Sequence, residues 1–263
     1  MEAEIDFTIS AQRNADAYYK KAKKLAQKRE GAQNAIAELG KKLEEVKKRN
    51  EAAPKHAFIK ATNREWYEKF HWFTTSEGFL VIGGRDSHQN EMLNARYFEE
   101  GDLFFHADIF GASAVILKKG VSAGAGSKSE TAQFAACYSS AWERMLSNID
   151  VYAVKRDQVS KSTNKGSLGA GSFLLKGERE WFRNMKLELV ALVKEGKLNV
   201  LPREAFDKMN YNATHILVRQ GKAKKSDAAK AIANALSYAD IDEIMRCLPA
   251  GSFEIQADRQ FSK

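Results

Sequence analysis

REWYEKFHWF, at residues 64–73, and VIGGRDSHQNE, at residues 81–91, are the two stretches of this chain that decide its fold. The first crowds large aromatic side chains together. The second is an apolar strand that ends in a glycine pair and a polar cluster. Trp66, Phe70 and Phe73 are spaced i, i+4 and i+7, which predicts one face of a short helix that anchors the core. An aromatic, cationic surface beside a tight polar turn suits a flat or charged polymer as its partner.

The glycine pair Gly83-Gly84 lets the backbone turn tightly between the strand and the segment that follows it. That segment, residues 85–97, is predicted to be a helix with Asp86 as its N-cap. A helix N-terminus with Arg85 beside it is suited to a phosphate group. The alternative is that Arg85 and Asp86 pair with each other or with neighbours, and chemistry alone leaves both interpretations open.

The pattern of apolar segments predicts an α+β fold with a mainly antiparallel sheet and flanking helices, preceded by a long helical (coiled-coil) arm. Five strands are expected in this sheet, with a crossing helix at 128–146: residues 79–82, 102–109, 114–117, 151–154 and 171–175. A smaller C-terminal unit is expected to contain a strand at 214–218, a helix that Ser226 caps and that runs to about Leu236, a helix at 241–247 and a strand at 252–256.

The arm is predicted as one helix from Ser10, its N-cap, to Arg49. Its side chains form a heptad seam, so the helix needs a partner along it. The first row of this seam is Tyr18, Leu25, Ala32, Leu39 and Val46, and the second is Ala22, Arg29, Ile36 and Leu43. Between residues 12 and 60 there are fourteen basic and six acidic side chains, and 14 − 6 equals the excess of eight in the whole chain. The arm therefore has either a solvated charged face or a surface for a polyanion.

The whole chain of 263 residues carries 42 Lys and Arg against 34 Asp and Glu, which gives a net charge of +8. This excess favours nucleic acid as a partner, with a membrane surface second. No apolar run approaches the length of about 18 residues that spans a bilayer, and the N-terminus has no signal-peptide apolar region. Cys137 and Cys247 form neither a disulfide framework nor a metal cluster. We expect a cytoplasmic protein without a membrane partner.

The candidate catalytic patterns in the sequence are weak. The segment GVSAGAGSK at 120–128 lacks the lysine that a phosphate-cradling loop places after its last glycine, so we expect a mobile strand-to-helix connection. His106 and Asp108 lie two residues apart on a predicted strand, a spacing that can serve a metal or an acid–base pair. A metal-dependent nuclease built on this pair ranks lowest, because no third ligand has suitable spacing. We expect no catalysis, no metal and no cofactor.

Six stretches of the chain, in this order, resemble the C-terminal RNA-binding domain of the NFACT family of ribosome-associated quality-control factors: WYEKFHWF (66–73), EGFLVIGGRDSHQNE (77–91), GDLFFHADIFGAS (101–113), SSAW (139–142), DQVSK (157–161) and GSFLLKG (171–177). SAQRNADAYYKKAKK (10–24) resembles the family's middle coiled coil. The resemblance implies three parts, which are coiled coil at 1–53, RNA-binding domain at 54–183 and an α/β extension at 184–263. The family usually has histidine where Phe110 stands, and its N-terminal domain has no counterpart, so we expect a fragment.

The resemblance implies binding of tRNA and of the large ribosomal subunit with obstructed peptidyl-tRNA, in the quality control of stalled nascent chains. Tailing of those nascent chains is not assigned to this chain. The predicted RNA-binding residues make phosphate contacts (Arg85, Lys161, Lys165 and the basic arm) or sugar, base and backbone contacts (His106, Asp108, Gln89 and Asn90), with Asp86 beside them. The alternative is an interaction scaffold whose coiled coil docks a partner protein without touching RNA.

Overall fold

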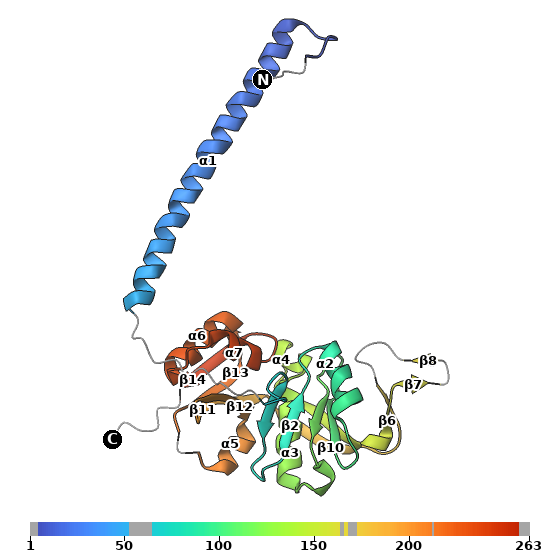
Figure 1. Cartoon of the computed structure of the whole chain (residues 1–263). Helices are drawn as coiled ribbons and strands as arrows, with labels where there is room; N and C mark the ends of the chain where they lie inside the picture. Colours follow the sequence, from blue (N-terminus) through green and yellow to red (C-terminus); the bar gives the residue numbers. More distant parts are fainter. Residues whose placement is uncertain (1–4, 53–64, 164–165, 168–172, 212, 258–263) are drawn as a thin grey trace. The chain divides into compact units, whose positions relative to one another are not determined.

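The computed structural model describes residues 5–52, 65–163, 166–167, 173–211 and 213–257 (Figure 1). The chain divides into two compact units, Met1–His56 and Ala57–Lys263. It has the predicted α+β class, with a long N-terminal helix and antiparallel sheets with flanking helices. Within the described ranges, no helical segment combines the length and the hydropathy of a membrane span.

Helix α1 (Ala11–Ala52) forms the arm and confirms the helix predicted from Ser10 to Arg49. The Ser10 hydroxyl oxygen accepts a hydrogen bond from the backbone N–H of Arg13 at 3.3 Å, so Ser10 caps the helix as predicted. Three apolar side chains of the predicted seam are exposed: Leu25 (57%), Ile36 (69%) and Leu39 (64%).

The larger sheet lies in the second unit, and every strand in it is antiparallel to its neighbours. Its strands, in spatial order, are β1 (His71–Thr74), β2 (Leu80–Gly83), β4 (Val115–Leu117), β3 (Leu103–Ala107), β5 (Asn148–Lys155) and β10 (Glu180–Lys186). Four of the five predicted strands are therefore confirmed. The fifth, at 171–175, is described only as β9 (Leu174–Leu175), which pairs with β6 (Val159–Ser160) in a separate two-stranded sheet. A further pair joins β7 (Ser162–Thr163) to β8 (Gly166–Ser167).

The helix predicted at residues 66–73 is wrong, because this segment is a turn followed by strand β1. Burial alternates along β1, so successive side chains face opposite sides of the sheet. Phe70 and Phe73, predicted on one helix face, belong to the two different core clusters. Trp66 does not enter the core. It is 45% exposed and stacks on Tyr97.

Helix α2 (Ser87–Met92) continues into a π-helical turn at Leu93–Tyr97, which confirms the helix predicted at 85–97. The Asp86 carboxylate accepts a hydrogen bond from the backbone N–H of Gln89 at 2.8 Å, so Asp86 is the N-cap, as predicted.

The single helix predicted at 128–146 is two helices, α3 (Ala125–Cys137) and α4 (Ser140–Glu143). The division falls at Ser139, whose side chain accepts a hydrogen bond from the backbone N–H of Ala141 at 3.2 Å and so caps α4. A serine that can cap a new helix competes with continuation of the first one.

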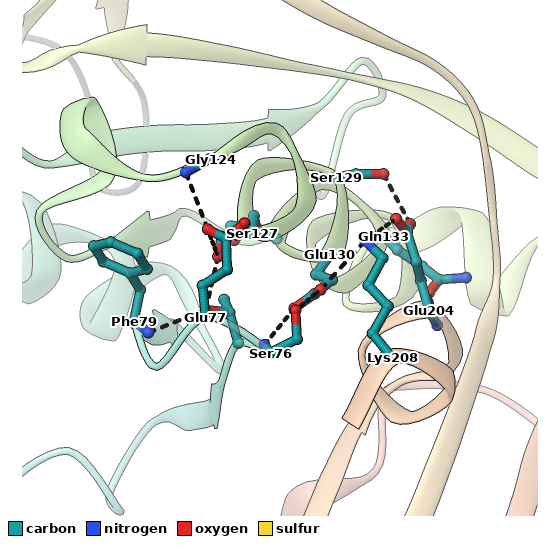
Figure 2. Close-up of polar contacts among 12 residues, drawn as sticks. Ser76, Glu77, Phe79, Gly124, Ser127, Ser129, Glu130, Gln133, Glu204 and Lys208 are labelled. Carbon is teal, nitrogen blue, oxygen red and sulfur yellow. Dashed lines mark hydrogen bonds and ion pairs between the residues drawn. The ribbon is translucent and has the colours of Figure 1, made fainter. Parts of the chain in front are cut away.

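The segment at 120–128 is ordered by contacts rather than being a mobile connection. It contains a 3₁₀ turn at Gly120–Ser122 followed by the first turn of α3. The Glu77 carboxylate accepts hydrogen bonds from the backbone N–H of Gly124 at 3.0 Å and from the Ser127 hydroxyl at 2.7 Å (Figure 2). The Glu77 carboxylate therefore already occupies the Gly124 N–H and the Ser127 hydroxyl, which a phosphate at this turn would need.

A second carboxylate, Glu130 of α3, is fully buried beside this turn (Figure 2). It accepts hydrogen bonds from the backbone N–H of Ser76, at 2.8 Å, and from the Ser76 hydroxyl. Its charge is also 3.3 Å from the Lys208 ammonium of α5 (Arg203–Met209). Glu130 therefore ties the β1–β2 turn, α3 and α5 together through a paired buried charge.

The smaller sheet is formed by β12 (Lys197–Pro202), β11 (Glu188–Lys194), β13 (His215–Ala223) and β14 (Phe253–Ala257), in that spatial order. Helices α6 (Lys225–Leu236) and α7 (Ile241–Cys247) complete this part of the chain (Figure 1). The predicted strands at 214–218 and 252–256 and the predicted helices are confirmed. Ser226 is not the cap, because α6 already starts at Lys225. The β11–β12 hairpin was not predicted.

The core is continuous across both sheets of the second unit. Phe105 of β3 and Val190 of β11 belong to one cluster of buried apolar side chains. Phe104, which points to the opposite face of β3, belongs to a second cluster. The boundary predicted at residue 183 falls inside β10, and the three-part division of the chain stays a prediction.

We expect His71 to make the second unit sensitive to acid. Its imidazole is buried, stacks on Tyr138, and has no hydrogen-bond partner at Nδ1. Burial, with smaller contributions from the charges of Arg85 and Lys225, lowers the pKa of His71 well below its ordinary value. As the pH falls, the His71 imidazole therefore takes up a proton in the unfolded chain before it does so in the folded chain. The contribution of His71 to the free energy of unfolding is fully present above about pH 6.5, and below that pH it falls by up to about 1.4 kcal/mol per pH unit.

Urea unfolding at pH 7.5, 6.5 and 5.5 measures this loss. His71→Gln removes one titrating group and should make the decrease below pH 6.5 shallower. An equal pH dependence in the two proteins would contradict the role assigned to His71.

Candidate functional site

A pocket of about 460 Å³ lies where the start of α2 meets β3, β5 and β9. Its principal lining side chains combine cationic, amide and aromatic groups: Arg85, Asn90, Phe104, His106, Tyr152 and Phe173. All of these belong to the second unit. The lining residues of the pocket lie up to 175 − 85 = 90 positions apart in the sequence, from Arg85 to Leu175.

The structure brings four of the eight predicted site residues into the lining of this pocket: Arg85, Asp86, Asn90 and His106. Three others are described but do not line it: Gln89, Asp108 and Lys161. Lys165 lies outside the described residues.

Arg85 is half-buried, and part of its guanidinium is engaged within the protein. Its Nη2 donates hydrogen bonds to the carbonyl oxygens of Phe70, at 3.0 Å, and Glu68, at 3.3 Å. Its Nε is buried without a partner, and burial lowers the pKa of Arg85 from its ordinary value. Arg85 therefore braces the turn before β1, and its Nη1 makes no bond to any described residue.

Two polar side chains of α2 also form hydrogen bonds within the protein. Gln89 accepts a hydrogen bond from the backbone N–H of Arg85 at 3.1 Å and donates to the carbonyl of Lys69 at 3.2 Å. The Asn90 carbonyl oxygen accepts a hydrogen bond from the backbone N–H of Ala114 at 3.1 Å. Because Asn90 is buried, this bond fixes one wall of the pocket.

We expect Gly84→Ala to distort this wall. A Cβ atom at residue 84 would lie 2.1 Å from Asn90 Oδ1 and 2.9 Å from the backbone nitrogen of Asn90. Relief requires Asn90 to leave the Ala114 N–H, so the free energy of unfolding should fall by about 1–3 kcal/mol. Urea unfolding measures the change. In an Asn90→Ala background the same substitution should cost less, and an equal cost in both backgrounds would contradict the proposed clash.

His106 lies on the pocket side of β3. Its Nδ1 is 3.2 Å from the Tyr152 hydroxyl. Burial is the largest influence on its pKa and lowers it, although backbone hydrogen bonds and the nearby Asp108 charge act in the opposite direction. Asp108 itself follows the end of β3 and is exposed, and its backbone N–H donates to the carbonyl of Asp150 at 2.8 Å. The two side chains therefore do not form the same-strand pair that was predicted.

Lys161 follows β6, and its ammonium forms an ion pair with the Glu91 carboxylate of α2. A phosphate would compete with that carboxylate for the lysine. Among the residues that the structure describes, no three His, Cys, Asp or Glu side chains lie close enough together to hold a metal ion.

Sequence reasoning missed the basic and aromatic side chains of β10. Arg179 directly precedes this edge strand, and Trp181 and Arg183 lie on it, so the three side chains follow a spacing of two that is typical of one sheet face. The Arg179 guanidinium lies 4.6 Å from the centroid of the Tyr152 ring, which lines the pocket. The Arg183 guanidinium lies 4.2 Å from the Trp181 ring and forms an ion pair with Asp150. This alternation was the signal available in the sequence.

Residues 69–177, which include all the lining residues of the pocket, match the NFACT protein RNA binding domain. The archaeal Rqc2 homolog aRqcH of Methanocaldococcus jannaschii is 36% identical over 200 residues, which cover 73% of this chain and 29% of that protein. The ribosome quality control complex subunit NEMF homolog of Drosophila melanogaster is 35% identical over 194 residues, which cover 71% of this chain and 19% of that protein.

The chain belongs to the NFACT family, and it spans less than a third of the length of these two relatives. Among solved structures, the C-terminal part of the fibronectin/fibrinogen-binding protein from Streptococcus suis aligns with 68% of this chain and 77% of its own, at 20% identity and a TM-score of 0.40.

Proposed function

We propose that this chain binds RNA in the ribosome-associated quality control of stalled nascent chains, and that it acts by binding rather than by catalysis. The observation that carries the proposal is the match of residues 69–177 to an RNA binding domain. The relatives named above, an Rqc2 homolog and a ribosome quality control complex subunit, support the cellular process.

The proposed ligands are tRNA and the large ribosomal subunit with obstructed peptidyl-tRNA, in the cytoplasm. Both expose unpaired loop nucleotides, which proteins recognise through stacking and hydrogen bonds to base edges. We assign phosphate contacts to Arg85, Lys161 and Lys165, and sugar or base contacts to His106, Asn90 and Asp108. Asp86 and Gln89 shape this surface through the cap of α2.

The charge of α1 supports the same proposal. Between residues 11 and 42 there are nine basic and three acidic side chains, an excess of 9 − 3 = 6. Lys42 with Glu38 is the ion pair described on this helix. Unneutralised cations of this kind release counterions from a nucleic acid backbone when they bind it.

Sedimentation with purified large ribosomal subunits tests the proposal. We expect the chain to sediment with subunits that carry peptidyl-tRNA and to sediment less with vacant subunits. Equal sedimentation with both would contradict recognition of the obstructed state, and sedimentation with neither would contradict ribosome binding.

A second candidate function is a scaffold whose arm docks a protein partner without RNA contact. The exposed apolar row of Leu25, Ile36 and Leu39 on α1 favours it, because such a seam gains free energy when another helix covers it. The two candidates differ in salt dependence. Apolar docking should change little between 50 and 500 mM salt, whereas RNA binding should weaken steeply.

A further inference from the structure

We infer that the pocket between α2, β3 and β5 takes one unstacked nucleobase of an RNA strand, and that Arg179 binds the adjoining phosphate. This inference rests on the proposed RNA binding and adds a subsite to it. The pocket volume of about 460 Å³ lies in the range of roughly 300–1,000 Å³ typical of small-molecule sites.

The walls of the pocket are flat and aromatic. The rings of Phe104 and His106 lie nearly parallel, at 7°, with centroids 6.2 Å apart. Phe173 meets the Phe104 ring edge-on at 5.6 Å, and the Tyr152 ring is 5.7 Å from His106. A planar heterocycle gains stacking and edge contacts from such walls.

Phe110 makes the opening of this pocket unusual. It lines the pocket, yet it is 91% exposed. Its backbone carbonyl accepts a hydrogen bond from the Ser140 hydroxyl at 2.6 Å, which holds the loop while the ring faces solvent. The solvent-exposed Phe110 ring can therefore cover a base bound in the pocket, and this contact would bury apolar surface of the ring.

Polar groups with unused hydrogen-bonding capacity stand at the same pocket. The Asn90 carbonyl oxygen is occupied by the Ala114 N–H. Among the described residues, the Asn90 amide nitrogen and Arg85 Nη1 donate to no neighbour. Both are donors, and base edges and ribose oxygens are acceptors. Burial lowers the pKa of His106, which favours its neutral form. His106 therefore offers the pocket a flat, uncharged ring.

Arg179 supplies the charge that a nucleotide needs next to its base. Its guanidinium lies 4.6 Å from the Tyr152 ring centroid and 5.9 Å from that of Trp181. It forms no ion pair with any described residue, in contrast to Arg183. An arginine stacked on the pocket wall with unpaired donors is suited to a phosphate.

A base can enter this pocket only after leaving its stack and its pairing partner. The subsite therefore predicts tighter binding of single-stranded or loop RNA than of duplex RNA with the same number of phosphates. It also predicts that a free nucleotide binds weakly at the same place.

The experiment uses the whole chain with two probes. The first is a ten-nucleotide single-stranded RNA with 2-aminopurine at its centre, whose binding is measured by fluorescence. The second is AMP, whose binding is measured by chemical-shift perturbation of the protein. We expect 2-aminopurine fluorescence to change on binding, and AMP to perturb resonances of residues in the pocket. Phe110→Ala should weaken RNA binding roughly 5- to 150-fold, the equivalent of about 1–3 kcal/mol for one stacked base.

Matched controls separate the subsite from general charge and exposure. Arg179→Gln should weaken binding more than Arg144→Gln, which removes the same charge from another exposed arginine outside the pocket. Met145→Ala, at a side chain that is 52% exposed and outside the pocket, should leave the affinity unchanged.

The outcomes distinguish this inference from the proposed function. If the chain binds RNA but Phe110→Ala and Arg179→Gln behave like their controls, the pocket is not the base site and RNA binding stands. If AMP binds in the pocket while no RNA polymer binds at low salt, the subsite stands and the proposed function fails. Absence of both kinds of binding overturns both.

Discussion

Replacing Lys20, Lys21, Lys24 and Lys28 with glutamine is expected to weaken tRNA binding by roughly 10²- to 10³-fold at 0.1 M salt. At 100° per residue, these four positions of α1 lie within about 100° of the helix circumference, so they form one cationic stripe. All four side chains are exposed. A polyanion that follows the helix can contact them together.

The salt dependence of this variant is more informative than its affinity alone. Each phosphate contact contributes about −0.7 to the slope of log K against log salt on single strands. Loss of four contacts should therefore reduce the slope by about 2.8. The four Lys→Arg replacements keep the charge and should keep the slope. If glutamine and arginine variants share the wild-type slope in fluorescence titrations, the arm does not contact RNA phosphates.

Trp142→Ala is expected to lower the free energy of unfolding of the second unit by about 3–5 kcal/mol. Trp142 of α4 is fully buried, its indole N–H donates to the carbonyl of Ser252 at 3.2 Å, and its ring packs 5.8 Å from Phe253 of β14. The side chain of Gln220 on β13 donates to the Trp142 carbonyl at 3.2 Å. This tryptophan therefore connects the larger sheet's helices to the smaller sheet.

The matched control is Trp66→Ala, which removes a tryptophan that is 45% exposed and should cost much less. Circular dichroism during urea unfolding measures both. Because the two sheets share one core, Trp142→Ala should shift a single transition. Two separate transitions, only one of them shifted, would show that the sheets unfold independently and would contradict the shared core.

The sequence predicted most reliably the elements whose signals are local. α1 combines a cap, Ser10, with a long helical period, and β2 is an apolar run closed by glycines. The segment at 66–73 failed because a spacing of four suits both a helix face and one side of a strand. The spacing of three between Phe70 and Phe73 distinguishes a helix from a strand, because in an extended chain an odd spacing puts two side chains on opposite faces of the sheet.

The β11–β12 hairpin was missed although its signal was present. Two apolar runs flank Glu195-Gly196, and both residues have positive φ, 52° and 75°, as a two-residue hairpin turn requires. The pocket is a different case. Tyr152 lines the same pocket as Arg85 because of the strand order of the larger sheet, and Phe173 joins them from the residue before β9 in a separate sheet. No local pattern in the sequence contains that order.

The contacts of individual site residues were also beyond sequence reasoning. Arg85 was expected to bind a phosphate, and its guanidinium also braces the Glu68 and Phe70 carbonyls. Lys161 was expected to be available, and Glu91 pairs with it. The partners of Arg85 and Lys161 lie on other segments of the chain, so the residues next to them in the sequence could not reveal these contacts.

The most direct test of RNA binding by this chain is a fluorescence anisotropy titration of the whole chain with tRNA and with duplex DNA of equal phosphate number, between 50 and 300 mM salt. We expect tRNA to bind more tightly at every salt concentration, with an affinity that falls linearly on log–log axes. Equal affinity for the two nucleic acids, or a tRNA affinity that does not change with salt, would contradict this account.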